Sequence, residues 1–157
     1  MNVLEAISKR HSYRGKFKPD SIPREALIKI VQAGLDAPSG CNKQTTSFIA
    51  IDDPDVLQSI HAVIDPPIGE TAPAAICVLT QRINAHRDRC FAVQDYSAAI
   101  QNMLLAIVEL GYQSCWYVSC RLVLLKMNQR FLRKRHLSRE PGSMDLIKSN
   151  FRVSLLV

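Results

Sequence analysis

The chain has 157 residues, of which 47% are hydrophobic and 22% are charged, the proportions of an ordinary globular protein with a core of its own. No apolar run approaches the roughly 20 residues of a membrane span, and the first residues lack the pattern of a signal peptide. The odd number of cysteines, five, favours reduced thiols in a cytoplasm over a disulfide framework. No His or Cys spacing indicates a metal site.

The net charge of +6 is unevenly distributed along the chain. Residues 1–120 contain 11 Lys/Arg and 12 Asp/Glu, a net charge of −1, whereas residues 121–157 contain 9 and 2, a net charge of +7. The positive charge therefore belongs to an atypical basic segment in the last quarter of the chain. The rest has the charge balance of an acidic-to-neutral metabolic protein.

The first third of the chain predicts two helices and a strand. Residues 2–8 predict a short helix. Ser21 is predicted to be the N-cap of a second helix, whose apolar residues recur at helical spacing as far as Leu35. This helix should end before Pro38, because proline disfavours helical backbone in the residue that precedes it. Residues 47–51 then predict a strand bounded by polar residues.

Asp53 and Pro54 predict the start of a third helix, which should end at the Pro-rich segment 65–69. Its buried face is expected to carry Leu57, Ile60 and Ile64. The continuous apolar run 74–79 suits a buried strand.

The most apolar segment is 96–110, where hydrophobic side chains cover most of the circumference of one helix. Asp95 is expected to cap or favour its start and Gly111 to end it. A helix that is apolar nearly all round must be buried in a core or against a partner. Residues 114–118 predict the next strand. With no repeats or linkers, residues 1–157 are expected to form one domain of mixed α and β structure.

Two polar stretches are candidates for binding. The stretch from Arg10 to Arg14 carries two guanidiniums and the Ser12 hydroxyl, which could converge on one anion because arginine matches phosphate geometry. Taken alone, the stretch is better explained as a surface loop with two solvated arginines. Residues 37–44 combine small residues with the amide of Asn42, but they could also form a helix-ending turn with polar tips.

Three stretches, taken in order, are similar to the nitroreductase-like flavoproteins. They are Arg10-His11-Ser12-Tyr13-Arg14, Ala37-Pro38-Ser39-Gly40 with Asn42 and Gln44, and Gln101-Asn102 followed by Leu110-Gly111 and Cys115-Trp116. The resemblance covers about residues 1–120. It implies an α+β fold with a central, mostly antiparallel sheet flanked by helices. It also implies an intertwined homodimer that binds FMN between its two chains.

The resemblance implies a role for each motif. Arg10 and Arg14 would hold the FMN phosphate, while Ser39 and Asn42 would reach the flavin ring and ribityl chain. The full set of implied FMN-binding residues is Arg10, His11, Ser12, Arg14, Pro38, Ser39, Asn42, Gln44, Val118 and Ser119. No catalytic side chain is predicted, because the cofactor carries the redox chemistry. For the polar pair Gln101-Asn102 we prefer a purely structural role inside a helix interface.

The implied activity is a ping-pong oxidoreductase reaction. NAD(P)H would reduce FMN, leave, and be replaced by a small-molecule acceptor such as a nitroaromatic or a quinone. One alternative is an inactive or flavin-poor family member with an altered C-terminus. Another is a binder of nucleic acid or of an anionic surface, which would act through the basic tail, although this tail lacks a recognisable nucleic-acid-binding motif.

The chain departs from the family pattern in several places. Thr45 and Thr46 stand where the family usually has proline and an aromatic residue, and Ser119 stands where it often has glycine. Beyond residue 120 the resemblance is lost. Either the coding frame shifts there, or the tail is genuinely divergent, with a basic helix near 124–137 and a strand at 151–157. An uninterrupted frame on resequencing the gene would exclude the shift.

Overall fold

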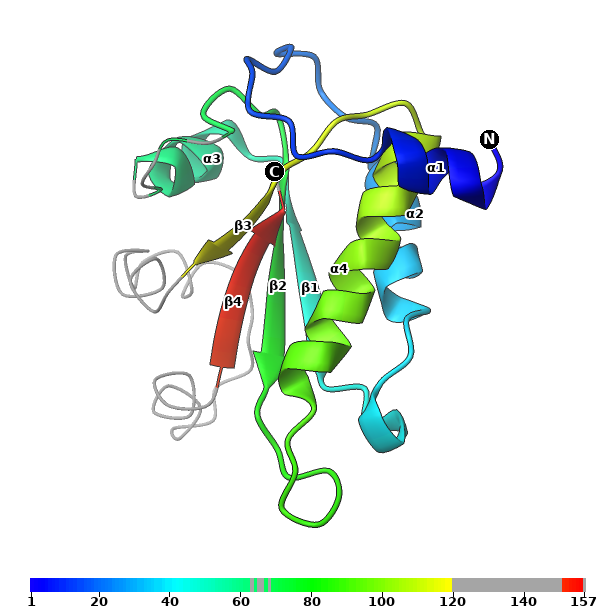
Figure 1. Cartoon of the computed structure of the whole chain (residues 1–157). Coiled ribbons are helices and arrows are strands. Elements are labelled where there is room, and N and C mark those ends of the chain that lie inside the picture. Colours follow the sequence, from blue (N-terminus) through cyan, green and yellow to red (C-terminus); the bar gives the residue numbers. More distant parts are fainter. Residues whose placement is uncertain (63, 65–66, 68, 120–150, 157) are drawn as a thin grey trace.

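The structure is a computed structural model that describes residues 1–62, 64, 67, 69–119 and 151–156. Four helices, one short 3-10 turn and four strands make up this part of the chain (Figure 1). In chain order they are α1 (Val3–Lys9), α2 (Arg24–Leu35), η1 (Gly40–Asn42), β1 (Thr46–Ile51), α3 (Pro54–His61), β2 (Ala75–Gln81), α4 (Ala92–Glu109), β3 (Trp116–Ser119) and β4 (Phe151–Leu156). None of the described helices is long and apolar enough to cross a membrane.

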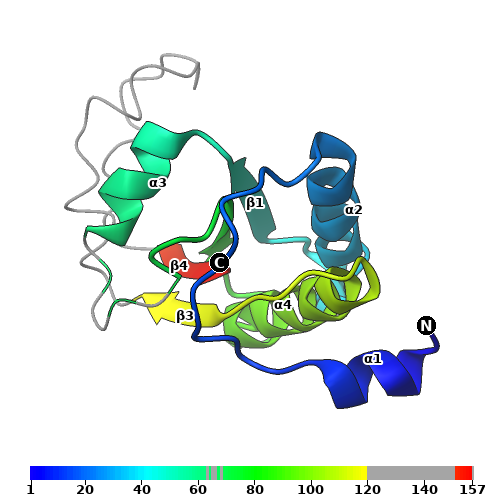
Figure 2. The same ribbon diagram turned by 90° about the horizontal axis from the view of Figure 1, so that it is seen from above.

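The strands form one sheet in the order β1-β2-β4-β3, and every neighbouring pair is antiparallel. In the register of the sheet, Cys77 of β2 lies between Ile49 of β1 and Leu155 of β4. Helices α2 and α4 cover one face, with α1 beside α4, and α3 covers the other (Figures 1 and 2). The predicted α+β fold, with a central antiparallel sheet flanked by helices, is confirmed.

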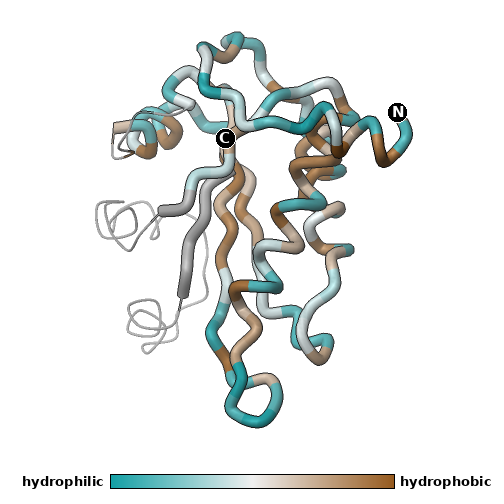
Figure 3. Tube along the Cα trace, in the orientation of Figure 1, coloured by the Kyte–Doolittle hydropathy of each residue, from teal (hydrophilic) through white to brown (hydrophobic). Residues whose placement is uncertain are grey.

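The core has two apolar clusters, one on each face of the sheet, because β2 is buried on both sides. Ile76 and Val78 face α4, and the alternating Ala75 and Cys77 face α3, as the two-residue period of a strand requires. Figure 3 shows the hydrophobic residues concentrated along the sheet and its helices, whereas the loop between β2 and α4 is hydrophilic. The continuous apolar run that predicted a buried strand is thereby confirmed.

Two helices begin with side-chain caps, one at Asn2, inside the predicted helix 2–8, and one at Asp53, where the sequence predicts a helix start. The Asn2 side chain accepts a hydrogen bond from the Glu5 N–H at 2.9 Å, and the Glu5 carboxylate accepts one from the Asn2 N–H at 3.2 Å. The Asp53 carboxylate accepts hydrogen bonds from the N–H groups of Asp55 and Val56 at the start of α3. Both helices are confirmed, but α3 ends at His61, before the Pro-rich segment that was expected to end it. Ile64, predicted on its buried face, is buried beyond the end of the helix.

The predicted N-cap of α2 is wrong. The helix begins at Arg24, not after Ser21, and the residue at the cap is Pro23, which makes no side-chain hydrogen bond. The Pro23 carbonyl instead accepts hydrogen bonds from the N–H groups of Ala26 and Leu27, at 2.9 and 3.2 Å. Proline favours this place because its ring sets φ near the helical value and it has no N–H to leave unpaired.

The start of α4 also differs from the prediction, since the helix begins at Ala92, about one turn earlier. Asp95 therefore lies inside the first turn, where it does not cap the helix, and its side chain is only 6% exposed. The end of the helix agrees with the prediction. Gly111 follows with a φ of 81°, a left-handed conformation that glycine adopts without strain.

The remaining boundaries shift by small amounts. The strand predicted at 114–118 is observed as β3 from Trp116, and the strand predicted at 151–157 is confirmed as β4. The basic helix predicted near 124–137 lies outside the described residues.

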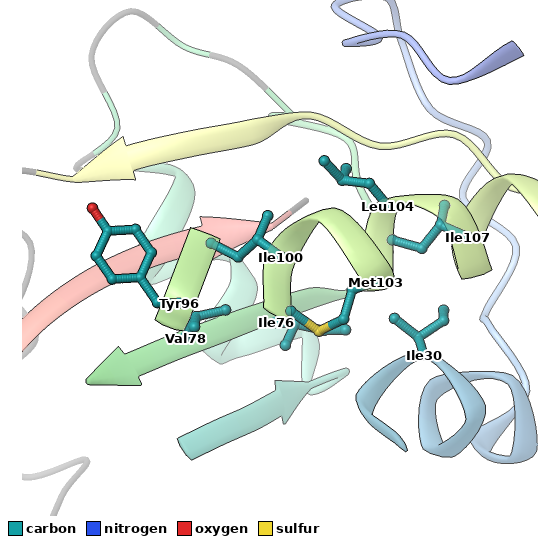
Figure 4. Close-up of a cluster of buried hydrophobic side chains, with 8 residues drawn as sticks. All are labelled: Ile30, Ile76, Val78, Tyr96, Ile100, Met103, Leu104 and Ile107. Atoms are coloured by element: carbon teal, nitrogen blue, oxygen red, sulfur yellow. The ribbon is translucent and has the colours of Figure 1, made fainter. Parts of the chain in front are cut away.

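Helix α4 buries most of its apolar surface within its own chain. Figure 4 shows Met103 of α4 beside Ile76 of β2 and Ile30 of α2, and Ile100 and Leu104 belong to the same buried cluster. Leu104 is 4% exposed, so its burial requires no partner chain. The large apolar side chains that remain exposed include three on α1, namely Val3, Leu4 and Ile7, with exposed fractions of 68%, 77% and 50%.

The burial of Cys77 predicts its reactivity. Burial raises the pKa of this thiol to about 11, because an apolar core disfavours the thiolate, which is the reactive form. Cys41 is exposed. We expect iodoacetamide at pH 8 to modify Cys41 in the native protein and to leave Cys77 unmodified until the protein unfolds, as measured by peptide mass spectrometry. Equal labelling rates in the native state would contradict this burial, and Cys41→Ser provides the control.

Candidate functional site

The first polar motif, Arg10 to Arg14, is tied by its backbone to the segment that leads into β3. Ser12 forms an isolated parallel bridge with Ser114, and the Tyr13 N–H donates to the Ser114 carbonyl at 2.9 Å. The loop therefore lies beside the C-terminal end of α4, where the chain turns back toward the sheet (Figure 2).

In the part of the chain that the structure describes, no acidic side chain forms an ion pair with the guanidiniums of this motif. Among the residues that the structure describes, the one ion pair joins the N-terminal amine of Met1 to Glu109 at 2.9 Å. Arg14 is exposed and Arg10 is half-buried. An anion that approaches this loop would meet two cations without carboxylate partners, together with the Ser12 hydroxyl.

Two further side chains of the first motif, those of His11 and Tyr13, contact residues that are close to them in the sequence. The Nδ1 atom of His11 lies 3.0 Å from the Lys9 carbonyl. The Tyr13 ring meets Phe17 edge to face, with ring centroids 4.9 Å apart, and its hydroxyl donates to the Lys16 carbonyl at 3.1 Å. The aromatic contact stabilises the turn that follows the two arginines.

The second polar motif connects α2 to β1 through the turn η1. Cys41, Asn42 and Gln44 have φ values of 52°, 54° and 49°, in the left-handed region that costs most side chains about 1–2 kcal/mol per residue. Ser39 crosslinks the turn internally. Its Oγ accepts from the Gln44 N–H at 3.0 Å, and its carbonyl accepts from the Asn42 N–H at 3.0 Å. Pro38 lies before the turn and is exposed.

A buried carboxylate of α4 holds both ends of this turn. Asp95 accepts a hydrogen bond from the Gly40 N–H through Oδ1 at 2.8 Å and from the Thr45 hydroxyl through Oδ2 at 3.2 Å. The Thr45 hydroxyl oxygen is also 3.5 Å from that of Thr80 in β2. Sequence reasoning assigned Asp95 to the start of the helix and missed this contact. The available signal was that Asp95 is the one charged residue before Glu109 in an otherwise uncharged helix.

Gly40 permits a close approach between the turn and the residue that precedes α4. A Cβ atom at this position would lie 2.5 Å from Cδ2 of Phe91 and 2.7 Å from its Cβ, so a side chain here would force the turn away from the helix. The absence of a side chain at Gly40 is thus needed for the turn to pack against Phe91.

Within one chain, the two motifs lie at opposite ends of α4 (Figure 1). The second motif is bonded to Asp95 in the first turn of the helix, whereas Ser12 and Tyr13 are bonded to Ser114, beyond its last turn. A helix of 18 residues is about 27 Å long. A ligand that touched both motifs of one chain would have to run the length of α4.

The remaining predicted residues fall into two groups. Val118 and Ser119 lie in β3, where they pair with Ser154 and Val153 of β4. Gln101 is exposed and Asn102 is half-buried, so this pair is not enclosed in the core of the chain.

Outside the two motifs, the imidazole of His61 at the end of α3 has an unusual environment. Its Nε2 is buried without a hydrogen-bond partner among the described residues, and burial lowers its pKa against the opposing influence of Glu70. This side chain lies on α3, across the sheet from α4. No group of three His, Cys, Asp or Glu side chains in the described ranges could hold a metal ion.

The comparisons with known proteins agree with this arrangement. The model of the Nitroreductase family matches residues 7–64 and 58–122. A protein of Methanothermobacter thermautotrophicus, provisionally named NADH dehydrogenase/NAD(P)H nitroreductase, is 36% identical over 119 residues, which cover 74% of this chain and 60% of that relative. The chain therefore belongs to the nitroreductase family. It spans about three fifths of the length of that relative.

Solved structures share the fold. A protein of Desulfovibrio desulfuricans, provisionally named a nitroreductase and crystallised in complex with FMN, has a TM-score of 0.72 and 26% identity, with 99% of this chain and 83% of that chain covered. A nitroreductase of Bacteroides fragilis with bound FMN has a TM-score of 0.66 and 24% identity, with 99% and 87% covered. The family match ends at residue 122, close to the loss of resemblance that the sequence predicts.

Proposed function

We propose that this chain is an FMN-dependent NAD(P)H oxidoreductase of the nitroreductase type. The observation that carries the proposal is the pair of polar motifs within the family match, one with two guanidiniums that no described carboxylate pairs with and one with an exposed polar turn. When bound, FMN supplies the hydride-transfer chemistry. NAD(P)H and an acceptor such as a nitroaromatic or a quinone would then use one site in turn, as in a ping-pong reaction.

The residues of both motifs suit the chemistry of FMN. Arg10, Arg14 and Ser12 offer donors and positive charge for the phosphate. Asn42 and Gln44 are exposed, and their amides both donate and accept, as a flavin ring edge requires of its partners. His11, Pro38, Ser39, Val118 and Ser119 complete the proposed binding set. None of these side chains is proposed to transfer a proton.

A second copy of the chain would complete the site. Because the two motifs of one chain lie at opposite ends of α4, a two-fold homodimer with antiparallel α4 helices would bring the first motif of one chain to the second motif of the other. The exposed apolar residues Val3, Leu4 and Ile7 on α1 offer a surface for this contact. The proposed partner is therefore a copy of the same chain.

We also propose that residues 1–157 form one domain and that the protein acts in the cytoplasm. Strand β4 lies between β2 and β3, so the last described residues complete the sheet and do not form a unit apart. The four cysteines of the described part of the chain are free thiols, which suits a reducing compartment.

One other function has a specific observation in its favour. The family match ends at residue 122, and the basic segment 121–157 departs from the family pattern. A chain altered in this way could keep the fold and lose its affinity for FMN, which would make it a flavin-poor member of the family.

The visible absorbance of the purified protein distinguishes the two candidates. The proposed function predicts a yellow protein that releases FMN on denaturation and oxidises NAD(P)H when a quinone or nitroaromatic is present. A colourless protein that takes up no added FMN would support the flavin-poor candidate and overturn the proposal.

The first motif predicts a loss of flavin affinity in Arg10→Ala and Arg14→Ala. A hydrogen bond to a charged group contributes about 1.5–3 kcal/mol, so each change should weaken FMN binding about tenfold or more. Quenching of flavin fluorescence measures the affinity. Lys29→Ala, which removes an exposed cation from α2, is the control and should leave it unchanged. If the variant that lacks both arginines retained all its FMN after dialysis, Arg10 and Arg14 would not be the residues that bind the phosphate.

The second motif predicts a different effect for Asn42→Ala. This side chain is proposed to meet the flavin ring, so its loss should shift the reduction potential and slow hydride transfer while most of the bound FMN is retained. Potentiometric titration and stopped-flow reduction by NADH measure the two effects. A potential and a rate equal to those of the wild type would exclude Asn42 from the ring contacts.

The exposed face of α1 predicts the effect of Leu4→Asp. Leu4 is 77% exposed, so the change should leave the single subunit folded, but a charge buried in a dimer interface should weaken association about a hundredfold. Analytical ultracentrifugation should show a monomer with reduced FMN content. The matched variant Ile28→Asp, on α2, should remain a dimer. If Ile28→Asp dissociates and Leu4→Asp does not, the proposed interface on α1 is wrong.

A further inference from the structure

We propose that Asp95 is a positioning residue for the turn that carries Asn42 and Gln44. Its carboxylate would hold this turn in the one conformation in which the two amides can meet the flavin. The inference rests on the proposed function, since it assumes that the turn contacts FMN.

The hydrogen bonds of Asp95 define a clamp on both ends of the turn. One carboxylate oxygen accepts from the Gly40 N–H at 2.8 Å and the other from the Thr45 hydroxyl at 3.2 Å. The four residues between these two donors include the three with left-handed backbone. A carboxylate is the one side chain of this size with two acceptor oxygens and no donor, which matches two donors arriving from the two ends of a turn.

The stability of α4 alone does not account for a carboxylate at this position. Asp95 is 6% exposed and lies next to Tyr96, Ala99 and other buried side chains of the helix. Burial of a charge is costly unless hydrogen bonds compensate, and an apolar residue would pack there without this cost. The N-terminal position on α4 favours negative charge, but exposed positions of the first turn would offer the same benefit.

The clamp also connects the turn to two rigid elements. Asp95 belongs to the buried helix α4, and the Thr45 carbonyl accepts a hydrogen bond from the Gln81 N–H of β2 at 3.1 Å. The Thr45 and Thr80 hydroxyl oxygens are 3.5 Å apart. A residue held by both the helix and the sheet can fix the exposed amides that precede it, which is what precise contact with a flat cofactor requires.

A set of four variants tests the clamp. Asp95→Leu removes both acceptors, and Thr45→Val removes one donor at nearly constant volume. Asp95→Asn should rescue, because its carbonyl can still accept from Gly40 and its NH₂ can donate to the Thr45 oxygen. Thr45→Ser, which keeps the hydroxyl, is the matched control.

The first measurement needs no flavin. Amide hydrogen exchange of residues 40–45 in the protein without FMN should accelerate about five- to tenfold in Asp95→Leu and less in Thr45→Val, with rates close to wild type in Asp95→Asn and Thr45→Ser. Unchanged exchange in both Asp95→Leu and Thr45→Val would overturn the clamp. If Asp95→Leu does not fold, the exchange rates of Thr45→Val and Thr45→Ser are compared instead, and faster exchange in Thr45→Val alone supports the clamp.

The second measurement connects the clamp to the cofactor. The reduction potential of bound FMN in the Asp95→Leu holoprotein should shift in the same direction as in Asn42→Ala, and Asp95→Asn should restore it. Thr45→Val replaces Asp95→Leu here too if the latter fails to fold. Lower thermal stability with an unchanged potential would overturn the positioning role and leave Asp95 purely structural. A wild-type chain that binds no FMN would overturn the proposed function, and with it the positioning role, while accelerated exchange would still establish the clamp.

Discussion

The burial of α4 against α2 and β2 is the interaction on which the rest of the structure depends. Ile100 and Met103 are fully enclosed, so the helix has a fixed position on the sheet. Each end then anchors a different polar segment. Asp95 holds the turn before β1 at one end, and the chain beyond Gly111 meets the loop of Ser12 at the other. A buried helix thus sets the places of two exposed motifs that have no contact with each other.

This separation divides the chemistry of the proposed site between two surfaces. One end presents positive charge that has no carboxylate partner among the described residues, which suits a phosphate. The other end presents amides and a strained turn, which suit a polar ring edge. Within one chain the two halves lie at opposite ends of α4, about 27 Å apart, so one chain alone does not bring them together. A dimer would therefore serve the site itself, in addition to covering the apolar face of α1.

Features that depend on a few neighbouring residues are readable from the sequence. The helix start at Asp53 and the helix end at Gly111 follow from local chemistry, and the continuous apolar run of β2 marks a strand buried on both faces. The exception shows the limit of such reasoning. Ser21 has the right side chain for a cap, but the helix begins at Arg24, where Pro23 already supplies a suitable backbone.

The sequence by itself determined the order and type of most elements, the two motifs and the family resemblance, because periodicity, caps and short motifs act over a few residues. Only the tertiary structure decided that the motifs lie at opposite ends of α4 and that Leu104 is buried within the chain itself. It also decided the role of Asp95, whose partners Gly40 and Thr45 are 55 and 50 residues away along the chain. Contacts over such separations depend on how helices and strands pack, and no local pattern encodes them.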